Sequence, residues 1–345
     1  MPKPTINRLD PATAEESSLR ACHSVWTSVA RLDFPTVAQS SYEAFMERIA
    51  QDDPESRLHL WAAQVGEATA GVALAVYPEL ENTALVEINV RVAADARRQG
   101  VGSALLSRVA QDASASGRTV LRTAQVLLES AGERWARARG FAEMDRGAWQ
   151  SLSVPTVDPE RWAVAVPAGF RLEAWCGAAP EDLVETYAQA RTAILDAPLN
   201  PDAAIRHPDW TVERVRNHEE ASRVAREELR VVAAVDEKLG CIVGFTETAF
   251  SPSRPLMCYQ LDTAVLVGYR GNGLGPSLKA RMMRWLTAER PTITQVVTRT
   301  DASNTAMIDV NRRLGYEIDF IGISVEASVS DVLDRLRNPQ VDRNA

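Results

Sequence analysis

Hydrophobic and polar residues follow the same order of periods in both halves of the chain. Short apolar or alternating runs predict strands, and a 3.6-residue period predicts helices. In the first half the predicted strands are residues 60–63, 71–76, 83–92 and 119–126, and the predicted helices are 101–114 and 130–139. In the second half the strands are 229–236, 241–249, 258–265, 294–299 and 317–325, and the helices are 275–288 and 304–314. This alternation predicts an α/β (α+β) fold, with a mixed central sheet flanked by helices in each half.

A proline-rich stretch without a sustained period, residues 151–167, lies between the two halves. A chain of 345 residues is too long for one ordinary core, so its length favours two domains. We predict an N-terminal domain over residues 1–153, a linker over 154–167 and a C-terminal domain over 168–345. Residues 180–227 read as mostly helical with a break at 196–201, and they either roof a substrate pocket or support the fold.

A glycine-rich hexapeptide precedes the first helix of each half, as Arg97-Arg-Gln-Gly-Val-Gly102 and Arg270-Gly-Asn-Gly-Leu-Gly275. The two arginines are 270 − 97 = 173 residues apart, which is one domain length. Glycines let a backbone turn tightly around an anion, and the N–H groups at a helix start bind phosphate. Neither copy has the Gly-Lys-Ser/Thr of an ATP loop or the GxGxxG of a dinucleotide fold. The pair therefore predicts a different nucleotide-bearing ligand.

Composition narrows the choice of partners. The formal net charge is −8, which argues against nucleic acid because phosphate backbones need a basic face. The four cysteines form no CxxC pair and the four histidines are scattered, so we expect neither a metal site nor a disulfide framework. The sequence shows neither a signal peptide nor an apolar run long enough for a membrane span, so we expect a cytoplasmic protein without a membrane partner.

Both hexapeptides resemble the coenzyme A pyrophosphate loop of the GNAT superfamily of N-acetyltransferases. The second half also carries an asparagine-containing helix, which begins at Asn304 and ends in Leu314-Gly315-Tyr316, as that superfamily does. The run from Asp262 to Gly275 further resembles tandem actinobacterial proteins related to mycothiol synthase. The resemblance implies acetyl-CoA as co-substrate and transfer of its acyl group to a small-molecule amine. The alternatives are a non-catalytic acyl-CoA-binding module, a longer-chain acyltransferase and a mycothiol-synthase-like reaction.

The resemblance also implies which residues contact the coenzyme. In the second half these are Val265, Val267, Arg270, Gly271, Asn272, Gly273, Leu274, Gly275, Asn304 and Asn311, with a backbone N–H near Val265 polarising the thioester carbonyl. In the first half they are Arg97, Gly100 and Gly102. The first half has no counterpart of Asn304, so we assign catalysis to the second and expect a degenerate first copy.

Catalytic residues are harder to choose. Glu247 and Asp262 are candidate bases because both lie on predicted central strands, although each equally suits an ordinary ion pair. Asn311 stands where many relatives have a tyrosine that protonates the leaving thiolate, and an amide is not a useful acid. Tyr316, Tyr259 or water would replace it, although Tyr316 also suits core packing.

Several other residues have two readings. Trp175 and Tyr187 either line an acceptor pocket or pack in the core. Lys279 either lends charge to the coenzyme phosphates or lies on a solvated helix face. His207 and His218 belong to a charged stretch and are expected to be solvated. The oligomeric state is a monomer or a homodimer, with a mild preference for the monomer.

Overall fold

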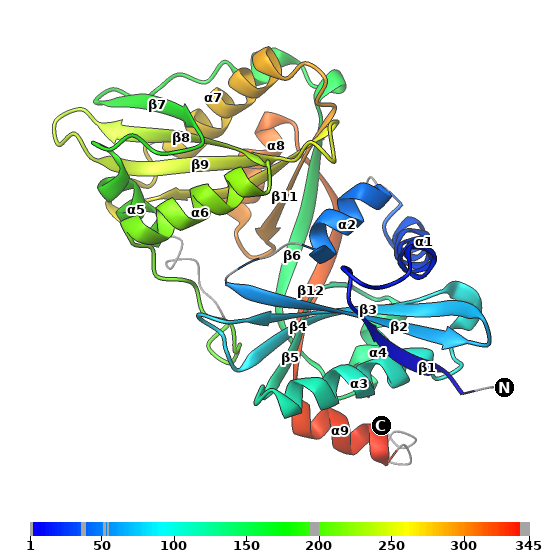
Figure 1. The fold of residues 1–345 in the computed structure, drawn as a ribbon. Coiled ribbons are helices and arrows are strands. Elements are labelled where there is room, and N and C mark those ends of the chain that lie inside the picture. The colour runs from blue at the N-terminus through cyan, green and yellow to red at the C-terminus, as the bar shows by residue number, and fades with distance from the viewer. Residues whose placement is uncertain (1–2, 36–38, 51–52, 54, 194–199, 339–345) are drawn as a thin grey trace. The chain divides into compact units, whose positions relative to one another are not determined.

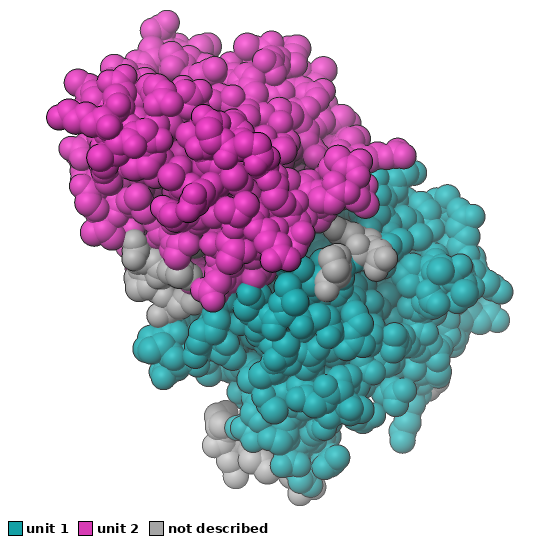
Figure 2. All heavy atoms as spheres, turned by 60° about the vertical axis from the view of Figure 1, so that its left-hand side comes forward, with its two compact units in different colours: residues 1–146, 199–206, 322–345 teal, residues 147–198, 207–321 magenta. Residues whose placement is uncertain are grey.

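The computed structural model describes residues 3–35, 39–50, 53, 55–193 and 200–338, which form helices and strands throughout (Figure 1). They divide into two compact units (Figure 2). Unit 1 comprises Met1–Arg146, Leu199–Arg206 and Gly322–Ala345, and unit 2 comprises Gly147–Pro198 and His207–Ile321. Each unit thus draws on both halves of the sequence, whereas the predicted domains 1–153 and 168–345 are contiguous.

Unit 1 has a mixed sheet in the order β1-β2-β3-β4-β5-β12, in which only β4 and β5 are parallel. Its strands are β1 (Thr5–Leu9), β2 (Ser56–Val65), β3 (Ala68–Pro78), β4 (Leu85–Val92), β5 (Val120–Leu127) and the end of β12 (Glu317–Ser328). Its helices are α1 (Glu16–Asp33), α2 (Tyr42–Ala50), α3 (Val101–Ala115), α4 (Ala131–Ala138) and α9 (Val329–Arg337).

Unit 2 repeats this plan in the order β6-β11-β10-β9-β8-β7, with β10 and β11 parallel. Its strands are the end of β6 (Ala142–Ser153), β7 (Phe170–Cys176), β8 (Glu228–Asp236), β9 (Ile242–Phe250), β10 (Met257–Val265) and β11 (Gln295–Asp301). Its helices are α5 (Val184–Thr192), α6 (Val212–Val224), α7 (Leu274–Glu289) and α8 (Thr305–Leu314). The predicted α+β fold with two repeated units is confirmed.

The last strand of each sheet comes from the other half of the sequence. Strand β6 follows α4 in the chain, yet its residues 147–153 pair with β11 in unit 2. Strand β12 follows α8, yet its residues 322–328 pair with β5 in unit 1. The exchange explains why neither unit is a contiguous stretch.

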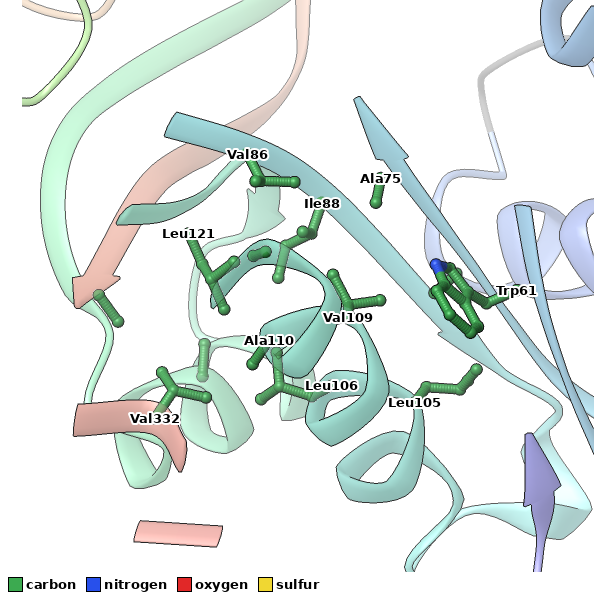
Figure 3. Packing of buried hydrophobic residues seen from close by; sticks show 14 of the residues in the cluster. Trp61, Ala75, Val86, Ile88, Leu105, Leu106, Val109, Ala110, Leu121 and Val332 are labelled. Atoms are coloured by element: carbon green, nitrogen blue, oxygen red, sulfur yellow. The ribbon is translucent and has the colours of Figure 1, made fainter. Parts of the chain in front are cut away.

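Each unit buries an apolar stripe of its central helix against the sheet. In α3, Val101, Leu105 and Val109 recur at every fourth position and pack with β4 and β5 residues such as Ile88 and Leu121 (Figure 3). Val332 of α9 belongs to the same cluster. Residues four apart share one face of a helix, so this spacing turns a single side toward the sheet.

The stretch predicted as a linker, residues 154–167, packs within unit 2. It contains 3₁₀ turns at Val154–Thr156 and Pro159–Trp162, and Trp162 is buried. The Trp162 indole N–H donates to the carbonyl of Leu314 at 3.0 Å. Residues 151–153, placed in the proline-rich stretch by the sequence, complete β6. The predicted helical break at 196–201 lies largely outside the described residues.

None of the described helices combines the length and the apolar character that crossing a membrane requires.

Candidate functional site

The two glycine-rich loops have the same backbone conformation. Gly100 and Gly273 precede their helices with φ of 82° and 80°, in the left-handed region that suits glycine. The arginine that opens each loop ties it to the strand before it. Arg97 Nε donates to the Val92 carbonyl at 3.2 Å, and Arg270 Nε donates to the Val265 carbonyl at 2.9 Å. The repeat seen in the sequence is therefore a repeat in three dimensions.

Both loops present the start of a helix whose first N–H groups have no side-chain cap. Such a helix start binds anions, so both loops fit a pyrophosphate. Their surroundings differ. A Cβ added to Gly275 would meet no atom within 4 Å, whereas one added to Gly102 would lie 3.6 Å from the Trp135 ring. At the preceding glycines the order is reversed, because a Cβ on Gly273 would lie 3.8 Å from Pro167 Cγ and one on Gly100 would meet no atom within 4 Å. The Trp135 ring beside Gly102 is therefore a local difference between the two loops.

Beside each loop, two parallel strands part into a fork. The β10–β11 pairing covers only three positions and ends at Tyr259 and Val297, while β10 continues to Val265. The Leu266 N–H donates to the Val243 carbonyl at 2.9 Å. Backbone groups alternate sides along an antiparallel pair, so the Val265 N–H points away from β9 and toward the fork. This is the orientation that polarising a thioester carbonyl requires.

Strand β10 carries one extra residue at its fork. Gln260 pairs with Thr248 and Thr263 pairs with Thr246, so two residues, Leu261 and Asp262, lie opposite Glu247. Strand β4 has no such shift against β3. From the last parallel pair to the end of the strand, β10 spans 265 − 259 = 6 steps and β4 spans 92 − 87 = 5 steps. A bulge of this kind redirects side chains next to a site.

A buried polar cluster lies against this bulge. Arg191 of α5 donates from Nη1 to Glu247 Oε1 at 2.8 Å and to the Tyr187 hydroxyl at 3.0 Å. Its Nη2 lies 3.8 Å from Asp262 Oδ2, and its guanidinium lies 3.5 Å from the centre of the Trp210 ring. The two carboxylates proposed from the sequence therefore share one arginine that sequence reasoning did not single out.

The two carboxylates differ in access and in pKa. Glu247 is 0% exposed; burial pushes its pKa up, but His218 and Arg191 outweigh burial and lower the pKa below its usual value. The Asp262 side chain is 46% exposed, and partial burial together with the Glu247 charge raises its pKa. Oε2 of Glu247 is buried and has no hydrogen-bond partner among the described residues. Glu247 is thus a fixed internal charge, and Asp262 is the carboxylate that a ligand can reach.

His218 was considered from the sequence, but its position beside Glu247 was not predicted. Its Nε2 lies 3.6 Å from Glu247 Oε1 and is buried, so the expectation that this side chain is simply solvated is wrong. Tyr187 packs edge-on to Trp175 in the core behind Arg191. No sequence signal pointed to Arg191 or His218, because they come from two helices without a motif.

The side chains of Asn304 and Asn311, in the α8 region, both bond to other groups of unit 2. The Asn304 side chain accepts the Met307 N–H at 3.1 Å and so caps α8. Asn311 is fully buried and donates to Gln150 Oε1 at 2.9 Å and Thr300 Oγ1 at 3.2 Å. These two bonds use both amide hydrogens, so in this arrangement Asn311 cannot also donate to a thiolate.

Tyr316 and Lys279 both lie in the core of unit 2. The Tyr316 hydroxyl contacts the Met283 sulfur at 3.9 Å, and burial raises its pKa. Lys279 is 2% exposed, with Nζ 5.2 Å from the Tyr316 ring centre, and burial lowers its pKa to about 7. The expectation of a solvated Lys279 is wrong.

The remaining loop residues have simple surroundings. Val267 is exposed, Asn272 Nδ2 donates to the Tyr269 carbonyl at 3.2 Å, and Gly271 has a φ of 81°. Leu274 is buried as the first residue of α7. Within the described ranges, no group of three or more His, Cys, Asp or Glu side chains is placed to hold a metal ion.

In unit 1 the fork has different neighbours. Leu74, 173 residues before Glu247, is buried in an apolar cluster with α1 residues such as Trp26. Arg122, at the last parallel pair, is buried between Glu326 at 2.7 Å and Asp145 at 3.0 Å. Oε2 of Glu326 accepts the Ala204 N–H at 2.8 Å, which holds residues 200–206 against β12 in unit 1.

Solved structures share this fold. A tandem GNAT protein from the clavulanic acid biosynthesis pathway, solved without acetyl-CoA, matches with a TM-score of 0.78 at 20% identity over 95% of this chain and 99% of its own. A GCN5-related N-acetyltransferase from Sphaerobacter thermophilus matches with a TM-score of 0.70 at 15% identity over 94% and 96%. These identities support the fold alone. No match was found among curated proteins.

The family model described as acetyltransferase (GNAT) family matches twice, over residues 23–143 and 194–316. The two matches together cover more than half of the chain, and each contains one of the glycine-rich loops. This protein therefore belongs to the GNAT acetyltransferase family, with two tandem GNAT regions.

Proposed function

We propose that this protein transfers the acyl group of acetyl-CoA to a small-molecule amine, and that the reaction takes place in unit 2. The observation that carries the proposal is the bulge in β10, which brings a reachable carboxylate, Asp262, to the fork beside an open anion-binding loop. Unit 1 has the loop but neither the bulge nor counterparts of Glu247 and Asp262, whose positions are occupied by Leu74 and Asn89. We infer that unit 1 supports the fold, and a second coenzyme site in the titration below would overturn that inference.

The residues of unit 2 supply three parts of an acyl transfer. The N–H groups at the start of α7 and the glycines of the loop bind the pyrophosphate. The Val265 N–H donates to the thioester oxygen, which gains negative charge as the amine attacks. Asp262 holds the acceptor amine as an ammonium ion, while Arg191 and Glu247 fix the position of the Asp262 carboxylate.

A second candidate function is binding of acyl-CoA without chemistry. One observation favours it: both amide hydrogens of Asn311 are already bonded, and the Tyr316 hydroxyl lies in the core. Neither side chain protonates a leaving thiolate from this position, so turnover requires Tyr259 or water for that step. A mycothiol-synthase-like or longer-chain reaction would share the same fork and would differ in the acceptor or acyl group.

Calorimetric titration with acetyl-CoA tests the assignment to unit 2. We expect one site per chain, lost in Gly275→Leu because the side chain would fill the open space, and kept in the matched variant Gly102→Leu. Thiol release from acetyl-CoA with a panel of aminoglycosides, amino acids and short diamines then separates catalysis from binding. Binding without thiol release for any amine would favour the non-catalytic module, and loss of binding only in Gly102→Leu would move the site to unit 1.

A further inference from the structure

His218 stands at the one place where the buried carboxylate of unit 2 meets partly exposed side chains. The imidazole is 35% exposed, but its Nε2 atom is buried and directed at Glu247 Oε1 at 3.6 Å. The ring also packs edge-on to Trp210, with centroids 5.8 Å apart. Because Nε2 faces inward, Nδ1 lies on the other side of the ring.

This arrangement is that of a histidine oriented by a carboxylate. A buried carboxylate that accepts one ring N–H fixes the tautomer and leaves the other nitrogen as a proton acceptor. At 3.6 Å the pair is longer than a hydrogen bond, and such pairs tighten when substrate binds. Glu247 suits the orienting role because it is fully buried and its lowered pKa keeps it ionised.

The neighbouring charges are compatible with this role. Charged groups close to His218 include Glu247 from β9, Asp262 from β10 and Arg191 from α5. Arg214 lies one turn earlier on α6, with its guanidinium 5.8 Å from the centre of the Trp210 ring. Arg191 is held by Glu247 and stacked on Trp210, so its charge is matched. Asp262 is reachable and attracts an ammonium ion, which brings the amine toward the imidazole.

We propose that His218 is the catalytic base of unit 2, with Glu247 as its positioning residue and Asp262 as the anchor for the amine. The inference rests on the proposed function. The ammonium ion of the acceptor gives one proton to Nδ1 of His218, and the neutral amine attacks the thioester carbon. The new C–N bond forms, the C–S bond breaks with its electron pair on sulfur, and the second amine proton passes through water to that sulfur. The products are the amide, free coenzyme A and an imidazolium ion.

The test compares His218→Ala with His207→Ala, a histidine of unit 2 whose Nε2 has no hydrogen-bond partner among the described residues. We expect His218→Ala to lower kcat by about 100-fold, to remove the acid limb of the kcat against pH profile, and to recover part of its rate when imidazole is added. Acetyl-CoA affinity by calorimetry should stay within about threefold of the parent protein, since a base that acts on the amine contributes little to binding of the coenzyme. His207→Ala should change none of these.

The outcomes separate the two proposals. If the parent protein releases thiol with an amine but His218→Ala keeps kcat within about threefold and keeps its acid limb, His218 is not the base. A lowered kcat that imidazole does not restore, with the acid limb intact, also overturns the assignment. If the parent protein releases no thiol with any amine of the panel, the proposed function itself fails.

Discussion

The two glycine-rich loops are nearly superimposable in their backbone angles, yet the two forks beside them differ in kind. Positions 173 residues apart are equivalent in the two units, and some of them exchange an apolar for a charged side chain. Leu74 of unit 1 corresponds to Glu247 of unit 2, and Leu106 corresponds to Lys279. All four side chains are buried. Unit 1 has the apolar packing of Leu74 and the ion pairs of Arg122 at this place, whereas unit 2 has the buried pair of Arg191 and Glu247. Two copies of one loop therefore stand beside different side chains.

The largest expected effect concerns the loop of unit 2. Gly273→Val should lower thiol release by about 1,000-fold or more, because Gly273 has a φ of 80° and a β-branched residue would distort the anion cradle. The matched variant Gly100→Val should keep turnover within about threefold. Equal losses in both variants would mean that both loops contribute to catalysis.

The next effect concerns the free energy of unfolding. It is expected at Lys279 of unit 2, whose equivalent in unit 1 is Leu106. Burial lowers the pKa of Lys279 to about 7, whereas a lysine in the unfolded chain has the ordinary pKa of 10.5. Between these values the unfolded chain holds a proton that the folded chain lacks, so the free energy of unfolding rises with pH. Lys279→Leu should remove this rise and add up to about 4 kcal/mol at pH 7. Denaturant titrations of both proteins from pH 6.5 to 10.5 measure the difference, and parallel curves would contradict it.

A smaller effect is expected at the anchor. Asp262→Asn should lower kcat/KM by about 100-fold, mainly through KM, because the amide cannot hold an ammonium ion. Burial and the Glu247 charge raise the pKa of Asp262, so in the parent protein kcat/KM should fall as pH drops through a value above the usual range of an aspartate. Asn89→Asp on β4 of unit 1 is the control. An unchanged KM in Asp262→Asn would remove Asp262 from the site.

The smallest effect concerns the ring beside the unit 1 loop. Trp135→Ala removes the side chain that lies 3.6 Å from a Cβ placed on Gly102. If this ring is what distinguishes the loops, calorimetry with acetyl-CoA should show a second, weaker site, within about tenfold of the first in Kd. A single site in the variant would mean that features other than Trp135 keep the coenzyme from unit 1.

Local features were the part of the structure that the sequence predicted well. Every strand and helix proposed around the two loops is present, with ends shifted by a few residues. Glycine spacing and apolar periodicity depend on residues close together in the chain, so they can be recognised without knowing the tertiary contacts. Glu247 and Asp262 were chosen because they lie on central strands, and the structure brings them to one arginine.

The pairing of strands that are far apart in the sequence could not be predicted from periodicity. Periodicity predicts that residues 317–325 form a strand but does not name the strand beside it, so the exchange of β6 and β12 was missed. Burial was missed as well, because Lys279 in a helical pattern looks like a surface residue until its neighbours are known. Arg191 and His218 come from helices without a motif, and Trp210 lies just before one of them, so only their tertiary contacts show that they belong to one cluster.

The sequence by itself thus determined the repeat, the α+β fold and the two glycine-rich loops, because each depends on residues close together in the chain. Only the tertiary structure decided which side chains stand at each fork, which carboxylate is exposed and which histidine lies beside the buried carboxylate. These properties depend on contacts between residues far apart in sequence, where a single extra residue in β10 redirects the side chains that face the fork.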